Sequence, residues 1–200
     1  ELKDYPLYQI GQRVGSVFQN PRTQFYNVDT TSEIVFGCEN MALPVPEMRK
    51  RLEETAHSLK LEKLLNRSLF ALSGGEKQKI ACAGVSIMEL DVLVMDEPSS
   101  NLDAASILDL RKILAFWKSQ GKTIIVSEHR LYYLRGLADR FIYLADGQVS
   151  HDYSAAEFEQ LTEQQRSDMG LRTFALERLL PPVLPQQAKT ALALRNFHFA

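Results

Sequence analysis

The sequence has little of three things: cysteine, net charge and long apolar runs. Of its 200 residues two are cysteines, and the net charge is −2. No apolar run comes near the roughly eighteen residues that a membrane-spanning helix needs, and no signal peptide is visible. Cys38 and Cys82 lie in apolar stretches and are typical of reduced, buried thiols in a cytosolic protein. The small net charge gives no electrostatic reason to expect a nucleic-acid partner.

What the chain does contain is typical of one globular domain, or of one domain and a fraction of another. Hydrophobic residues make up 45% of the sequence and charged residues 24%. This balance is ordinary for a folded domain that buries a sizeable core. Because no apolar run is long enough to span a membrane, we expect that a role at a membrane would be carried out from the surface and through a partner.

The sharpest local signal is an acidic pair behind an apolar run. Val92–Met95 contains four apolar residues without alternation, which predicts a strand buried on both faces of a parallel sheet. Asp96 and Glu97 follow directly, and Pro98 comes next. Open α/β sheets bind ligands beyond the carboxyl ends of their strands, so this position suits a metal–phosphate site. The alternative is a strand that ends in a solvated acidic turn.

A capped helix is predicted just upstream. Ser73 is a plausible N-cap, and Glu76, three residues on, completes a capping box for a helix that runs to about Met88. Gly74 and Gly75 allow close backbone approach, and the helix start offers unpaired N–H groups to an anion. An ordinary capped helix would give the same pattern.

Together these stretches resemble a known family. LSGGEKQ (72–78) followed by VLVMDE (92–97) resembles the signature motif and Walker B strand of the ATP-binding cassette (ABC) ATPases. FQNPRTQ (18–24) and EIVFGCEN (33–40) narrow the resemblance to the ATPase subunits of energy-coupling factor (ECF) transporters and their cobalt and nickel relatives. The resemblance implies an α/β, P-loop NTPase-like parallel sheet core with an inserted helical subdomain. It also implies ATP and Mg as cofactors.

The resemblance assigns catalytic and metal-binding roles. Asp96 would hold magnesium, and Glu97 would act as the general base toward the attacking water. His129 would contact the γ-phosphate and orient that water, and Gln19 would touch both the magnesium and the water. A lone glutamine or histidine after a strand is more often an ordinary structural residue. These two assignments therefore depend on the presence of the acidic pair in the same sequence.

The resemblance also assigns residues to a facing cassette. The signature residues would serve the nucleotide of that second cassette rather than their own: Leu72, Ser73, Gly74, Gly75 and Glu76. Ser100 and Asp103 match a loop, the D-loop, that crosses the interface between cassettes. Asp103 could equally be a helix N-cap, and the two roles are compatible. Hydrolysis is therefore expected to need two cassettes.

Periodicity and turn signals predict the remaining elements. Residues 1–12 read as a loop or weak edge strand, and 31–41 as a helix with Thr31 or Ser32 as its N-cap. The other predictions are a strand over 13–18, a helix starting at Pro46, a helix over 107–117, a strand over 122–127, a helical stretch over 130–137, a hairpin around Asp146-Gly147, and helices over 154–166 and 171–180.

The expected organisation has four parts. Residues 1–30 and 91–152 would form a portion of a RecA-like core, and 31–90 a helical subdomain that ends in the signature motif. Residues 153–189 would hold C-terminal helices and a proline-containing linker, and 190–200 would open a second cassette in tandem. No G-x-x-x-x-G-K-S/T loop, which cradles nucleotide phosphates, occurs in the sequence. We expect an N-terminally truncated copy rather than a degenerate domain, because the other site residues are present.

The expected function is that of the ATP-hydrolysing subunit of an ECF-type importer of a vitamin or transition-metal ion. Its partners would be a second cassette and a transmembrane component, with no nucleic acid, at the cytoplasmic face of the cell membrane. A soluble ABC ATPase that acts on nucleic acid or ribosomes is the alternative. A regulatory fragment without catalysis is a third class.

Overall fold

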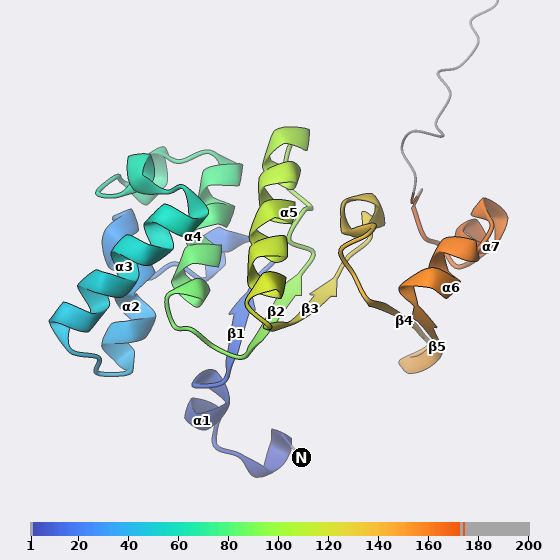
Figure 1. Cartoon of the computed structure of the whole chain (residues 1–200), viewed down its shortest axis with the longest axis horizontal. Coiled ribbons are helices and arrows are strands. Elements are labelled where there is room, and N and C mark those ends of the chain that lie inside the picture. The colour runs from blue at the N-terminus through green and yellow to red at the C-terminus, as the bar shows by residue number, and fades with distance from the viewer. Residues whose placement is uncertain (1, 173, 175–200) are drawn as a thin grey trace, which may run out of the picture.

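The core of the molecule is a small parallel sheet. The computed structural model describes residues 2–172 and residue 174 (Figure 1). Its sheet has the order β1-β2-β3, formed by β1 (Val14–Val17), β2 (Val92–Asp96) and β3 (Thr123–Ser127). Both pairings are parallel, so the three carboxyl ends meet at one edge. The strands predicted around these positions are confirmed.

Four longer helices connect these strands. Three lie in sequence between β1 and β2, and one lies between β2 and β3: α2 (Thr30–Asn40), α3 (Val45–Leu59), α4 (Gly74–Ser86) and α5 (Ala104–Ser119). Figure 1 shows α2 and α3 grouped at one side of the molecule, with α4 between them and α5. Three short 3₁₀ turns lie in the connection between β1 and β2: η2 (Pro21–Thr23), η3 (Glu62–Leu64) and η4 (Leu69–Ala71). Another, η1 (Leu2–Asp4), precedes the first strand.

Helices cover one face of the sheet. Gly15 lies so close to α4 that an added Cβ would be 3.1 Å from the Cβ of Val85. On the same face, Leu93 and Met95 are almost fully buried. On the opposite face Val94 is only half-buried and Ile125 is 54% exposed. The predicted burial of β2 on both faces is therefore found on one face only within the described residues, because α4 and α5 pack on that face alone.

The starts of two helices differ from the prediction by a few residues. Asp29, rather than Thr31 or Ser32, caps α2, and its carboxylate accepts a hydrogen bond from the Ser32 N–H at 2.9 Å. Asp29 is equally good as an N-cap, so local sequence could not choose among the neighbours. Helix α3 begins at Val45, which makes Pro46 its second residue.

A hairpin and two short helices follow the sheet. β4 (Arg140–Ala145) pairs antiparallel with β5 (Gln148–Ser154), as predicted. Asp146 and Gly147 both have positive φ, which the tight hairpin turn requires. The predicted helix over 154–166 is instead two helices, α6 (Ala155–Gln160) and α7 (Glu163–Asp168). Thr162 starts the second with its own capping box and so divides them.

One further prediction was wrong, and another was only partly right. Residues 7–11 form a short helix, α1 (Leu7–Gly11), instead of a loop or edge strand. The helical stretch over 130–137 is a single 3₁₀ turn, η5 (Leu131–Leu134). The predicted linker and the strand over 191–199 lie outside the described residues, as does most of the predicted helix over 171–180. In the part of the chain that the structure describes, no helix has the length and apolarity to span a membrane.

Candidate functional site

The acidic pair lies at the carboxyl end of the central strand. Asp96 is the last residue of β2 and is exposed. Glu97 follows with φ at 38°, in the left-handed region that residues other than glycine seldom adopt. Its N–H donates to the carbonyl of Ser127 at 2.8 Å, which ties this turn to the end of β3. Such backbone strain costs on the order of 1–3 kcal/mol and persists where the surroundings enforce it.

The Glu97 carboxylate is held from two sides. The side-chain amide of Gln19 donates to its Oε2 at 2.9 Å, and Nε2 of His129 lies 3.2 Å from its Oε1. Gln19 lies just beyond β1 and His129 just beyond β3, so the three side chains come from the ends of three neighbouring strands. The structure therefore brings Gln19, Asp96, Glu97 and His129 to one edge of the sheet.

The signature motif, residues 72–78, begins helix α4, which we call the signature helix, and the N-cap of this helix is complete. Ser73 N–H donates to the Glu76 carboxylate at 2.8 Å, and Glu76 N–H donates to the Ser73 hydroxyl at 3.3 Å. The predicted capping box is confirmed. The hydrogen bond from the Ser73 backbone lowers the pKa of the Glu76 carboxyl. The Ser73 side chain and the Arg67 charge lower this pKa further. The buried Lys77 ammonium donates to the Leu72 carbonyl and fixes the residue before the cap.

The signature helix packs against the loop that follows the acidic pair. A Cβ added to Gly75 would lie 2.1 Å from the Ser106 hydroxyl, and one added to Gly74 would lie 3.4 Å from the Asn101 carbonyl. The first distance leaves no room for any side chain at Gly75 without movement of α5. Ser73, Gly74 and Asn101 are exposed, so the two segments present one continuous surface to solvent.

Ser100 and Asp103 lie in that same loop. The Ser100 N–H donates to the Glu97 carbonyl at 3.1 Å, which links the loop directly to the acidic pair. Asp103 caps α5 by accepting from the Ser106 N–H at 2.7 Å, so its predicted N-cap role is confirmed. This backbone hydrogen bond lowers the pKa of the Asp103 carboxyl.

Sequence reasoning missed the residues on either side of His129. Glu128 accepts hydrogen bonds from four donors, and the Arg130 guanidinium reaches three backbone carbonyls of the loop at 99–102. A signal was present, because Glu128 directly follows the apolar strand β3, just as Glu97 directly follows β2. Its contacts join segments about thirty positions apart, and no local pattern predicts those.

The donor set at the strand ends suits magnesium bound together with phosphate. Among the described residues, no group of three or more His, Cys, Asp or Glu side chains could hold a metal by itself. Magnesium usually keeps several waters and takes only one or two carboxylates plus substrate phosphates. The exposed Asp96 carboxylate and the neighbouring Gln19 amide oxygen fit that role.

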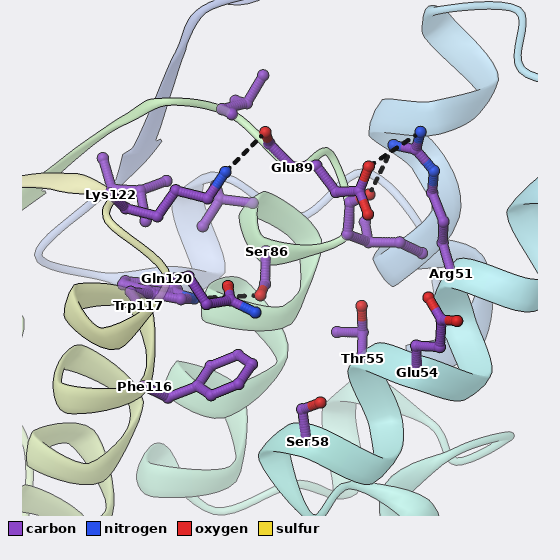
Figure 2. A pocket seen from close by; sticks show the side chains of 14 residues that line it. Arg51, Glu54, Thr55, Ser58, Ser86, Glu89, Phe116, Trp117, Gln120 and Lys122 are labelled. Carbon is purple, nitrogen blue, oxygen red and sulfur yellow. Dashed lines mark hydrogen bonds and ion pairs between the residues drawn. The ribbon is translucent and has the colours of Figure 1, made fainter.

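A separate pocket lies at the opposite end of the strands. Figure 2 shows it between α3 and the end of α5. The volume of this pocket is about 400 Å³. Arg51 spans its rim, paired with Glu89 at 3.1 Å, and Lys122 donates to the Glu89 carbonyl at 3.0 Å. The pocket includes none of the predicted site residues. Its cations are already engaged within the protein.

Comparison with known proteins identifies the class. The family model described as "ABC transporter" matches residues 1–100, half of the chain. The chain therefore belongs to the ABC transporter family, as an ATP-binding domain. Its fold matches the solved structure of CbiO1 from Clostridium perfringens, described as part of the ABC transporter complex CbiONQ. That match has a TM-score of 0.71 and 30% identity, over 79% of this chain and 62% of CbiO1.

Other relatives agree on the class. An ABC transporter ATP-binding protein from Treponema denticola is 51% identical over 83% of this chain and 34% of its own length. Another, from Methanosarcina mazei, is 37% identical over 76% of this chain and 26% of its own length. The ATP-binding cassette MJ0796 shares the fold, with a TM-score of 0.65 at 24% identity, over 76% of this chain and 68% of that one. The chain thus spans between about a quarter and about a third of the length of the Methanosarcina mazei and Treponema denticola relatives.

Proposed function

We propose that this chain is the ATP-binding and ATP-hydrolysing part of an ECF-type transport ATPase. The observation that carries the proposal is the Glu97 carboxylate, held between the Gln19 amide and the His129 ring beside the exposed Asp96. An acid, an amide and an imidazole around one point can accept a proton from a water molecule and orient that water for in-line attack on a phosphate.

Each residue has a distinct task in this proposal. Glu97 accepts a proton from the attacking water, whose oxygen bonds to the γ-phosphorus as the bond to the β-phosphate oxygen breaks. ADP and inorganic phosphate are the products. His129 and Gln19 orient that water and the γ-phosphate. Asp96, with Gln19, would hold Mg²⁺, which when bound neutralises negative charge on the phosphate oxygens.

The groups that cradle the triphosphate would come from outside these 200 residues. The sequence has no G-x-x-x-x-G-K-S/T loop, and β3 lies at an edge of the sheet as described. The face that carries Val94 and Ile125 is also open, although parallel sheets are normally covered on both faces. We expect the isolated chain to show negligible ATPase activity. Robust turnover by it would contradict this part of the proposal.

The signature helix and the loop at 99–103 would face a second cassette. Ser73 and Gly74 are exposed beside Asn101, so a neighbouring nucleotide could reach the helix N-terminus. Leu72 and Glu76 would hold that start in shape, while Ser100 and Asp103 would line the interface. A tandem partner encoded after residue 190 and a separate subunit both satisfy this geometry.

A transmembrane component would complete the assembly. The sequence FQNPRTQ at 18–24 supports the ECF subtype, and the similar CbiO1 is described as part of a CbiONQ complex. Residues 31–90 would form the helical subdomain that docks on that component, with 1–30 and 91–152 as the core and 153–189 as C-terminal helices and linker. The cargo would be a vitamin or a metal ion, and the protein would lie peripherally on the cytoplasmic face of the membrane.

A soluble ABC ATPase that acts on nucleic acid or ribosomes is the competing function. The net charge of −2 and the lack of a basic arm weigh against it, because nucleic-acid affinity depends on cationic contacts to phosphate. Purification of the full-length protein from its native membrane separates the two. Co-purification of a small membrane protein, with ATPase activity, supports transport. Nucleic-acid binding with a steep salt dependence would overturn it.

A further inference from the structure

Glu128 and Arg130, the two charged residues on either side of His129, bind the loop at 99–103. The catalytic roles proposed above do not account for these contacts. Glu128 and Arg130 both turn back onto the loop at 99–103, which follows the acidic pair in sequence. We propose that they are positioning residues that tie the loop at 99–103 to His129, so that engagement of that loop by a second cassette sets His129 against Glu97. This inference rests on the proposed function, and we call Glu128, Arg130 and Tyr133 the clamp.

The acidic half of the clamp gathers four donors on one carboxylate. Oε1 of Glu128 accepts from the N–H groups of His129 and Arg130 at 2.9 and 3.0 Å. Its Oε2 accepts from the Ser99 N–H at 3.3 Å and from the Tyr133 hydroxyl at 2.9 Å. One side chain thus fixes the backbone at His129 and the first residue of the loop at the same time.

Tyr133 keeps this carboxylate in place. The tyrosine is only 3% exposed, and burial, with the nearby Glu128 charge as a second cause, raises the pKa of its hydroxyl above the ordinary value. Burial therefore favours the protonated hydroxyl, which is the donor in this hydrogen bond.

The basic half of the clamp binds the other polar groups of the same loop. Nη1 of Arg130 donates to the carbonyls of Ser99 and Leu102 at 3.3 and 3.4 Å, and Nη2 lies 3.5 Å from the Ser100 carbonyl. A planar guanidinium can serve several carbonyls at once, which a lysine ammonium on a flexible stem does poorly. The loop is consequently held through both its N–H and its C=O groups.

The loop at 99–103 touches both the catalytic edge and the surface proposed to face a partner. Its Ser100 N–H donates to the Glu97 carbonyl, and its Asn101 carbonyl lies beside Gly74 at the start of the signature helix. A shift of this loop would therefore pull on Arg130 and Glu128, and through the intervening backbone on His129. The clamp supplies a physical route from the interface to the catalytic carboxylate.

The test uses the full-length protein with its second cassette. Arg130→Met removes the guanidinium donors and keeps most of the side-chain volume, while Arg130→Lys keeps the charge. We expect Arg130→Met to lower kcat by about 10- to 100-fold, as loss of supporting contacts around catalytic groups commonly does, with KM for ATP changed less than about two-fold. Arg130→Lys should recover part of kcat. Arg140→Met, which removes an exposed ion pair with Asp152 on the hairpin, is the matched control and should leave kcat unchanged.

A double-mutant cycle in single-turnover rates distinguishes positioning from a general loss of structure. If the clamp acts through His129, adding Arg130→Met to His129→Ala should slow the reaction no further. The inference would be overturned if the rate losses of the two single variants multiplied in the double variant. It would also be overturned by an unchanged kcat in Arg130→Met, or by a kcat loss in that variant that is accompanied by a lowered melting temperature. Failure of the proposed function would look different, because the unmodified full-length protein would then fail to hydrolyse ATP.

Discussion

Gln19 and Glu97 are 78 positions apart in the sequence, yet the amide of Gln19 donates to the Glu97 carboxylate at 2.9 Å. The contact exists because β1 and β2 are neighbours in a parallel sheet, so that residues just past their ends converge. It places an amide, which is both donor and acceptor, beside the proposed general base. The proposed water and metal would meet at this point.

The close approach of α4 and α5 makes one glycine sensitive to substitution. Gly75→Ala would place a Cβ 2.1 Å from the Ser106 hydroxyl, so we expect a loss of about 1–3 kcal/mol in the free energy of unfolding. Gly84→Ala in the same helix is the control. Its Cβ would be 3.7 Å from the Glu33 carbonyl, and alanine should stabilise the helix by about 0.5–1 kcal/mol.

Denaturant unfolding of the full-length protein, followed by far-UV circular dichroism, measures both variants. Ser106→Gly combined with Gly75→Ala should recover part of the loss, because it removes the atoms that clash. Equal stability of Gly75→Ala and the unmodified protein would show that the helices do not pack this closely.

The two cysteines should be unreactive in the folded protein. Both are free and buried, and burial raises the pKa of Cys82 to about 12 and also raises that of Cys38. A thiol reagent at neutral pH should label neither until denaturant is added, since the thiolate is the reactive form. Rapid labelling of the native protein would contradict the described packing.

The same thiols predict an alkaline decline in stability. The pKa of Cys82 is higher in the folded chain than its ordinary value of 9.0, so unfolding favours ionisation above that value. The contribution of Cys82 to the free energy of unfolding is therefore intact below about pH 9 and declines as pH rises toward about 12. Cys82→Ala should flatten this decline, measured by urea unfolding at a series of pH values.

Two helix caps predict the acid side of the stability profile. Hydrogen bonds from the Ser32 and Ser106 backbone lower the pKa values of Asp29 and Asp103 below 3.8. Their stabilisation is present above that value and is lost as pH falls through the lowered pKa of the folded state. Asn at both positions keeps the cap acceptor without the titration. The Asp29→Asn, Asp103→Asn double variant should therefore lose less stability on acidification, measured by urea unfolding at a series of acid pH values. An equal decline in the free energy of unfolding for both proteins would contradict this account of the two caps.

Much of the architecture could be predicted because it depends on local sequence. The capping box at Ser73 and Glu76, the N-cap at Asp103 and the turn at Asp146-Gly147 are each encoded within four residues. The start of α2 was placed too late because Asp29, Thr31 and Ser32 are all good caps. The helix over 154–166 was predicted as continuous because the break at Thr162 depends on a second cap that competes with the first.

The edge of the sheet that carries Gln19, Asp96, Glu97 and His129 was predictable only in part. The convergence of Gln19 and His129 on Glu97 follows from the rule that parallel strands end at one edge, once the strands are recognised. The clamp does not follow from any such rule, since Glu128 and Arg130 bind backbone groups of a loop distant in sequence. The tight fit of Gly75 against Ser106 likewise depends on how two helices meet.

Substitution of Glu97 by glutamine in the full-length protein tests the central claim most directly. The amide keeps the size of the side chain and can still meet Gln19 and His129, but it cannot accept the proton of the attacking water. We predict ATP binding at close to normal affinity, a kcat lower by about 10²–10⁴-fold, and a pair of cassettes that stays closed with ATP bound. Steady-state hydrolysis at the normal rate in this variant would contradict the assignment of Glu97 as the general base.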